Sequence, residues 1–173
     1  MLCKYSTQKI DITNTDVKDY ITTDNLLQDK QGYIPYDGVL NLDKVTSYQK
    51  GDVLISNIRP YLKKIWLADK SGGCSNDVLV VRLTNAKVLP KFLYYSLAQD
   101  AFFDYVMQRV KGIKMPRGDK AHIMNYTIAV PSIEDQKSII DEIESYEILI
   151  AQARKVMNGC AGRKTEIINR YLQ

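Results

Sequence analysis

The most regular pattern of apolar and polar positions runs from residue 132 to the end of the chain. Apolar or small side chains recur there in alternating steps of four and three residues. This spacing predicts a long α-helix with a heptad seam, about 60 Å long, that needs a second helix to cover it. Ser132 is the predicted N-cap, with Asp135 three residues later. The seam consists of Ile139, Ile143, Tyr146, Ile150, Ala153, Met157, Cys160, Ile167 and Tyr171, with Lys164 as an exception.

Two glycines interrupt this predicted helix. Gly159 and Gly162 each cost roughly 1 kcal/mol relative to alanine in a helix interior. They either permit a close helix crossing or mark a break near Asn158, where the chain would fold back as a helical hairpin. We favour one continuous helix.

Shorter patterns in the middle of the chain predict strands. Residues 52–58 (DVLISNI) and 63–68 (KKIWLA) flank a turn at Arg59-Pro60-Tyr61, which indicates a β-hairpin. Residues 76–83 (NDVLVVRL) are rich in β-branched side chains and predict a buried strand.

The rest of the first 131 residues is mixed. Pro90 opens a predicted helix over residues 91–110, whose aromatic positions we expect in the core, and residues 126–130 predict a further strand. Residues 7–50 are expected to be irregular or short-stranded. The fold class is therefore α+β: a mixed globular domain of short strands and helices over residues 1–131, followed by a coiled-coil-forming helix over residues 132–173.

Composition limits the class of protein. The chain has 173 residues, of which 45% are apolar and 25% charged, enough for one domain with an appendage and too apolar for general disorder. No apolar stretch approaches the roughly 20 residues that span a bilayer, and the N-terminus lacks the apolar core of a secretory signal, so we expect a cytoplasmic protein without a membrane segment. Cys3, Cys74 and Cys160 are too few and too widely spaced for a disulfide framework.

The net charge of +4 is concentrated in the middle of the chain. Residues 51–120 carry 12 basic and 6 acidic side chains, whereas the segments before and after each carry 6 basic and 7 acidic ones. Residues 109–120 (RVKGIKMPRGDK) hold five basic residues against Asp119, and their glycines and proline indicate a surface loop. This segment is either a solvated basic loop or the contact surface for an anionic partner.

Candidate catalytic groups are sparse. His122 is the single histidine and is expected to be a surface or packing residue, so no zinc set can be assembled. Phosphate-binding glycine motifs are absent, and Asp52, Asp69 with Lys70, and Asp77 form only a loose imitation of a metal-dependent nuclease site. We therefore expect a binding protein without cofactor or metal.

Four strings together resemble one family. They are GDVLISNIRPYLKKIW (51–66), GGCSNDVLV (72–80), KGIKMPRGDK (111–120) and PSIEDQ (131–136), the last preceding the long helix. In order and spacing they resemble the target recognition domain and adjoining spacer helix of the DNA-specificity subunit of type I restriction-modification systems.

The resemblance implies a non-catalytic subunit that reads double-stranded DNA for a methyltransferase (modification) subunit and a restriction endonuclease subunit. The family's usual chain has two recognition domains joined by two antiparallel helices, whereas this chain has one of each. It is therefore either a natural half-length subunit or a fragment. Two copies could pair through the heptad seam, and such a homodimer would read a symmetric, interrupted site.

DNA-contacting candidates come from the basic middle region. Arg117 is the first choice for a base, because a guanidinium can contact guanine bidentately. Asn57 and Arg59 could instead stabilise the hairpin turn, Asn76 could cap a strand, Tyr61 could belong to the core, and the bases could be read by loops within residues 28–48. Phosphate candidates are Lys63, Lys64, Lys111, Lys114 and Lys120, and the weaker base candidates are Asn57, Arg59, Tyr61 and Asn76.

Two rival functions remain open at this point. The chain could be a coiled-coil protein-interaction module without DNA binding, or a small metal-dependent nuclease. Retardation of random duplex DNA in a gel at low salt would exclude the interaction module without DNA binding. Cleavage of plasmid by the pure protein with Mg²⁺ would support the nuclease.

Overall fold

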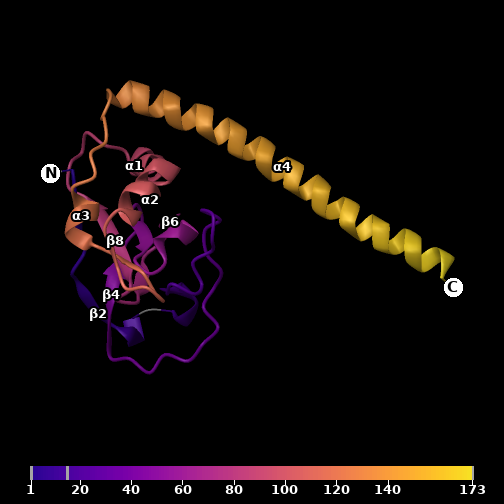
Figure 1. The fold of residues 1–173 in the computed structure, drawn as a ribbon, viewed down its shortest axis with the longest axis horizontal. Coiled ribbons are helices and arrows are strands. Elements are labelled where there is room, and N and C mark those ends of the chain that lie inside the picture. Colours follow the sequence, from indigo (N-terminus) through magenta and orange to yellow (C-terminus); the bar gives the residue numbers. More distant parts are fainter. Residues whose placement is uncertain (1, 15, 173) are drawn as a thin grey trace. The chain divides into compact units, whose positions relative to one another are not determined.

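The computed structural model describes residues 2–14 and 16–172, except for the side chains at positions 14, 17 and 161. The chain divides into two compact units, Met1–Ile133 and Glu134–Gln173. Among the described residues, the first unit contains two four-stranded sheets, a two-stranded sheet, three short α-helices and three 3-10 helices, and the second unit contains a single helix (Figure 1).

The first sheet is antiparallel with strand order β1-β8-β5-β6. The predicted hairpin is confirmed, because β5 and β6 pair with Val53 opposite Leu67. The predicted buried strand is confirmed as β8, whose first four side chains are buried. The bounds are β1 Cys3–Tyr5, β8 Val78–Leu83, β5 Val53–Ser56 and β6 Ile65–Leu67.

The second sheet has strand order β2-β4-β7-β3 and comes mostly from the region expected to be irregular or short-stranded. Only β3 and β7 pair in parallel. Its strands are β2 Lys9–Asp11, β4 Lys44–Tyr48, β7 Gly72–Cys74 and β3 Tyr20–Ile21, and short 3-10 helices lie at Ile12–Asn14 and Val17–Asp19.

The hydrophobic core contains side chains from both sheets. Leu54, Trp66 and Val80 of the first sheet belong to the same buried cluster as Tyr48 and Cys74 of the second. The Trp66 ring lies edge-on to the Tyr48 ring, with centroids 5.7 Å apart. Burial of large aromatic and β-branched side chains between two short sheets is what stabilises strands that are too short to be stable alone.

A buried ion pair ties the start of β5 to β8. Asp52 is 2% exposed and accepts two hydrogen bonds from Arg82, Nη2 to Oδ2 at 2.7 Å and Nε to Oδ1 at 2.9 Å. Such a bidentate pair is strongly directional. Asp52 was one of the candidate metal ligands of the nuclease alternative, and Arg82 occupies its carboxylate instead.

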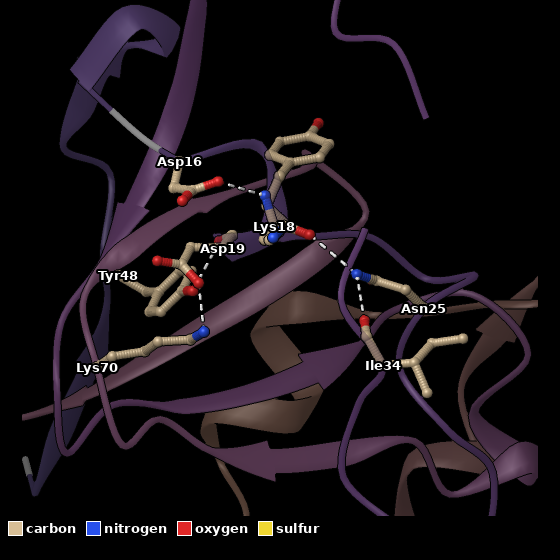
Figure 2. A network of polar contacts seen from close by, with 8 residues as sticks. Asp16, Lys18, Asp19, Asn25, Ile34, Tyr48 and Lys70 are labelled. Carbon is tan, nitrogen blue, oxygen red and sulfur yellow. Dashed lines mark hydrogen bonds and ion pairs between the residues drawn. The ribbon is translucent and has the colours of Figure 1, made fainter. Parts of the chain in front are cut away.

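The early irregular segment is held by hydrogen bonds between side chains and backbone (Figure 2). The Tyr48 hydroxyl donates to the carbonyl of Asp19 at 2.7 Å, and the Asp19 carboxylate pairs with Lys70. The Asn25 amide donates to the carbonyl oxygens of Tyr20 and Ile34 at 2.9 and 3.0 Å. These hydrogen bonds satisfy backbone carbonyl groups that would otherwise be satisfied by pairing with a neighbouring strand.

The helical part of the first unit differs from the prediction. The single helix expected over residues 91–110 is wrong, because α1 (Pro90–Leu97) and α2 (Asp100–Met107) are separate. Gln99 has an extended backbone and is the N-cap of α2, and Asp100 follows in the first turn, where a negative charge is favourable. Phe92, Phe102 and Val106 are buried as expected, whereas Tyr95 and Tyr105, also expected in the core, are only half-buried.

The region after α2 also differs. Residues 109–120 contain a small hairpin, β9 (Val110–Lys111) and β10 (Arg117–Gly118), rather than loop alone, and α3 (Lys120–Met124) follows it. The strand expected over residues 126–130 is wrong. Tyr126 donates its N–H to the carbonyl of Ile123 at the end of α3, and its ring packs against Phe102. Residues 126–130 therefore follow α3 as irregular chain and pair with no described strand.

The second unit is one helix, α4 (Ile133–Tyr171). The prediction of a continuous helix through Gly159 and Gly162 is confirmed, and a Cβ at either position would meet nothing within 4 Å among the described residues.

Candidate nucleic-acid interface

Three turns converge at one end of the first sheet. They are the β5–β6 connection (57–64), the β7–β8 turn (75–77) and the β9–β10 hairpin. Asn57 donates its N–H to the carbonyl of Asp77 at 2.8 Å and accepts from the N–H of Gly118 at 3.1 Å. Arg59 donates its N–H to the carbonyl of Pro116 at 2.8 Å. The three turns therefore form one hydrogen-bonded platform, which we call the three-turn surface.

The β5–β6 connection has an unusual backbone. Arg59 and Lys63 both have φ of 51°, in the left-handed region, and they flank the 3-10 helix η3 (Pro60–Leu62). For residues with a Cβ this conformation costs about 1–2 kcal/mol each. Lys63 recovers part of the cost by donating its N–H to the carbonyl of Pro60 at 2.9 Å. Backbone strain of this kind concentrates at functional sites, because the surrounding structure must maintain it.

Four basic side chains of the three-turn surface are exposed and are weakly paired or unpaired: Arg59, Lys111, Lys114 and Arg117. The Arg117 side chain is 54% exposed, and its Nη2 lies 3.2 Å from Asp77 Oδ1. Lys111 Nζ lies 3.4 Å from Asp119 Oδ2. Within the described part of the chain, no carboxylate pairs with Arg59 or Lys114. Because exposed ion pairs contribute about 0–1 kcal/mol, a phosphate can replace Asp119 as the partner of Lys111 at little cost.

Asp119 has a structural role at the start of α3. Its carboxylate accepts from the N–H groups of Ala121 and His122 at 3.0 and 3.1 Å and is the N-cap. The hydrogen bond from the His122 N–H holds the pKa of this carboxyl below its usual value, and Lys111 lowers it further. The His122 ring stacks on Tyr105 at 3.9 Å, as expected of a packing residue.

Lys63 and Lys64 are already engaged by the protein. Lys63 shares the Asp100 carboxylate with Lys30, at 3.0 and 2.7 Å. Lys64 Nζ donates to the carbonyl of Thr23 at 2.6 Å, and burial lowers its pKa. Both lysines are therefore less available to phosphate than Lys114.

The weaker base candidates differ in exposure. Tyr61 is 49% exposed, so the alternative that placed it in the core is wrong. Asn57 is buried beneath β10, and its backbone bonds to Asp77 and Gly118 favour the turn-stabilising alternative. Its Oδ1 has no hydrogen-bond partner among the described residues. Asn76 is exposed, and its Oδ1 accepts from Lys9 Nζ at 2.8 Å.

Two residues that position candidate side chains were not singled out for that role by the sequence reasoning. Asp77 was considered only as a nuclease ligand, yet its carboxylate orients Arg117 and its carbonyl holds the Asn57 turn. Lys9 lies in a three-residue strand outside the basic middle region. No sequence signal links Lys9 to Asn76, because the two are 67 positions apart.

A metal centre is not supported in the described part of the chain. No group of three or more histidine, cysteine, aspartate or glutamate side chains is close enough there to hold an ion. Asp52 and Asp77 are paired with arginines instead.

The heptad seam of α4 is exposed except at Ile143, which is half-buried. Tyr146, Ile150, Met157 and Tyr171 have half or more of their side-chain surface accessible, and Cys160 is also exposed. An apolar row of this length is typical of a surface that another helix covers. No described helix is long and apolar enough to cross a membrane.

Comparisons with known proteins agree with this architecture. Residues 2–157 match the family described as the type I restriction modification DNA specificity domain. The specificity subunit of the type I restriction enzyme EcoDI from Escherichia coli is 24% identical over 134 residues, which are 75% of this chain and 30% of that protein.

Solved structures show the same fold. The HsdS subunit from Thermoanaerobacter tengcongensis superposes with a TM-score of 0.68 at 21% identity, over 90% of this chain and 42% of that one. The type I restriction-modification S subunit from M. genitalium superposes with a TM-score of 0.58 at 12% identity, over 84% of this chain and 37% of that one. This chain thus spans less than half the length of these relatives, and it belongs to the family of type I restriction-modification DNA specificity domains.

Proposed function

We propose that this chain is a half-length specificity subunit that binds double-stranded DNA and reads one half of a split recognition sequence. The observation that carries the proposal is the three-turn surface, where Arg59, Lys114 and Arg117 are exposed on a hydrogen-bonded platform within a chain of this family. The chain itself does no chemistry in this proposal.

The charges of the three-turn surface divide into two tasks. Lys111, Lys114 and Arg59 contact phosphates and position the domain, which gives affinity without sequence information. Arg117 reads a base, because Asp77 holds one edge of its guanidinium and leaves the other donors free for the O6 and N7 atoms of guanine. Tyr61, exposed on the same connection, adds an apolar contact.

The partners follow from the exposed seam and the family. We infer that two copies pair through the seam of α4 to form a homodimer, which would read a symmetric interrupted site. The dimer would direct a methyltransferase subunit and a restriction endonuclease subunit to that site. The relatives come from bacteria, whose DNA lies in the cytoplasm, and we place the protein there.

Salt dependence of duplex binding tests the proposal. If Lys111, Lys114 and Arg59 each neutralise one phosphate, the logarithm of the association constant falls with the logarithm of salt at a slope of roughly −2.7. Lys114→Gln should flatten the slope by about 0.9, because it removes one phosphate contact. Lys155→Gln, which removes the same charge from exposed α4, should leave the slope unchanged.

The second candidate function is a coiled-coil interaction module, favoured by the exposed seam alone. It predicts no retardation of duplex DNA at low salt, whatever the oligomeric state. Light scattering of the pure protein, followed by co-purification with the methyltransferase subunit, tests the partners. Reproducible plasmid cleavage with Mg²⁺ by pure protein would show that the non-catalytic assignment is wrong.

A further inference from the structure

A second basic feature adjoins the three-turn surface and shares Asn76 with it. Lys9, Thr46, Asn76 and Lys120 line a groove of about 350 Å³ together with Tyr5 and the apolar side of β8. The groove has two lysines and no carboxylate in its lining. No acidic side chain of the lining therefore neutralises the two lysines, whereas Lys63 and Arg117 are each paired with an aspartate.

The ammonium group of Lys9 is fixed in place. Lys9 Nζ donates to Thr46 Oγ1 at 2.9 Å and to Asn76 Oδ1 at 2.8 Å. Lys9 and Thr46 face each other across the β2–β4 ladder, so the first bond follows from strand register. Both acceptors are neutral, and the full positive charge remains.

A lysine held in this way is prepared to bind an anion. Its ammonium has three N–H donors, of which two are used, and one remains. An ordinary surface lysine loses side-chain entropy when it is immobilised by a ligand. Thr46 and Asn76 have already fixed Lys9, so that loss is smaller.

The groove is continuous with the three-turn surface along the chain. Asn76, which holds Lys9, is followed by Asp77, which holds Arg117. Lys120 of the groove follows the α3 cap Asp119, and its carbonyl accepts from the Tyr5 hydroxyl at 3.0 Å. The β7–β8 turn thus connects a candidate base contact to a candidate anion contact.

We propose that this groove binds a phosphodiester of the DNA backbone, with Lys9 as the contacting residue and Thr46 and Asn76 as its positioning residues. The inference rests on the proposed function and extends its footprint to the second sheet. It also gives Asn76 a different task from base contact.

Charge-removing and charge-preserving variants test the groove. Lys9→Gln should weaken duplex binding roughly tenfold and flatten the salt slope by about 0.9. Thr46→Val keeps every charge but releases the ammonium, and should weaken binding roughly threefold. The double variant should bind as Lys9→Gln alone, because Thr46 acts only through Lys9.

Either of two results would show that Lys9 is not held in place for anion binding. One is Thr46→Val binding like the wild type, and another is additive losses in the double variant. Thermal unfolding checks that each variant folds. If Thr46→Val does not fold, Asn76→Ala, at an exposed position, replaces it with the same expectation.

Further outcomes distinguish a failure of this inference from a failure of the proposed function. If the wild-type protein binds duplex DNA and Lys9→Gln, Thr46→Val and the double variant all bind it equally well, the groove alone is overturned. Wild-type protein that binds no duplex overturns the proposed function and the assignment to DNA. Titration with inorganic phosphate then tests the groove as an anion site. Saturable NMR shifts at Lys9 that disappear in Thr46→Val support the site, and the absence of any shift overturns it.

Discussion

Gly118 is the position where the three-turn surface is most sensitive to a single methyl group. It lies in β10, next to Arg117, and its N–H donates to the carbonyl of Asn57. A Cβ added there would lie 2.8 Å from Ile123 Cδ1, 3.0 Å from Asn57 Oδ1 and 3.1 Å from Val106 Cγ1. All three distances are shorter than ordinary van der Waals contact.

The magnitude follows from what surrounds the added methyl group. Ile123, Asn57 and Val106 are all buried, so none can move into solvent to make room. Adding a methyl group to a well-packed interior costs roughly 1–3 kcal/mol. The alternative response is a shift of β10 away from the β5–β6 connection, which would displace Arg117 relative to Asp77.

Urea denaturation and duplex binding together measure this prediction. Gly118→Ala should lower the free energy of unfolding by about 1–3 kcal/mol, or else retain stability and lose affinity through the displaced hairpin. Gly159→Ala is the matched control. A methyl group there meets nothing, and helix propensity should raise helix stability by about 1 kcal/mol.

A Gly118→Ala variant with both wild-type stability and wild-type duplex affinity would refute the reasoning. It would mean that β10 does not pack against Asn57 and Val106 as described. Equal destabilisation by Gly118→Ala and Gly159→Ala would refute it as well, since the two sites differ in their surroundings.

Three further predictions concern other parts of the chain. Asp52→Asn should lower the free energy of unfolding by about 3 kcal/mol in thermal or urea melts, because it leaves Arg82 largely buried without its carboxylate. The pKa of Asp119 is lowered in the folded state, so its stabilising effect is present above the ordinary carboxyl range and is lost as pH falls through the folded pKa. The stability difference between wild type and Asp119→Asn should therefore shrink in strong acid. Ile150→Glu should shift the mass measured by light scattering toward the monomer, whereas Lys155→Glu, outside the seam, should not.

Periodicity predicted the elements whose packing is local. The β5–β6 hairpin was predicted from two short apolar runs on either side of a turn, and α4 from heptad spacing with one exception at Lys164, and both elements are present. The break between α1 and α2 has no glycine or proline to signal it. It arises because the chain must turn at Gln99 to bury Phe102 and Phe103, and that is a tertiary requirement.

The candidate site was predictable in charge and not in pairing. The concentration of basic residues in the middle of the chain pointed to Lys114 and Arg117, which are exposed on the three-turn surface. The engagement of Lys64 by a carbonyl, and of Lys9 by Asn76, depends on strand pairing between distant segments. Nothing in the local sequence encodes those distances.

Selection from a pool of random duplexes by the purified protein tests the central claim most directly. The account predicts retention at low salt and enrichment of a short base motif, symmetric about a gap if two copies pair, and a relaxed motif for Arg117→Ala. A pool that emerges unenriched, with no duplex retained even at low ionic strength, would contradict it.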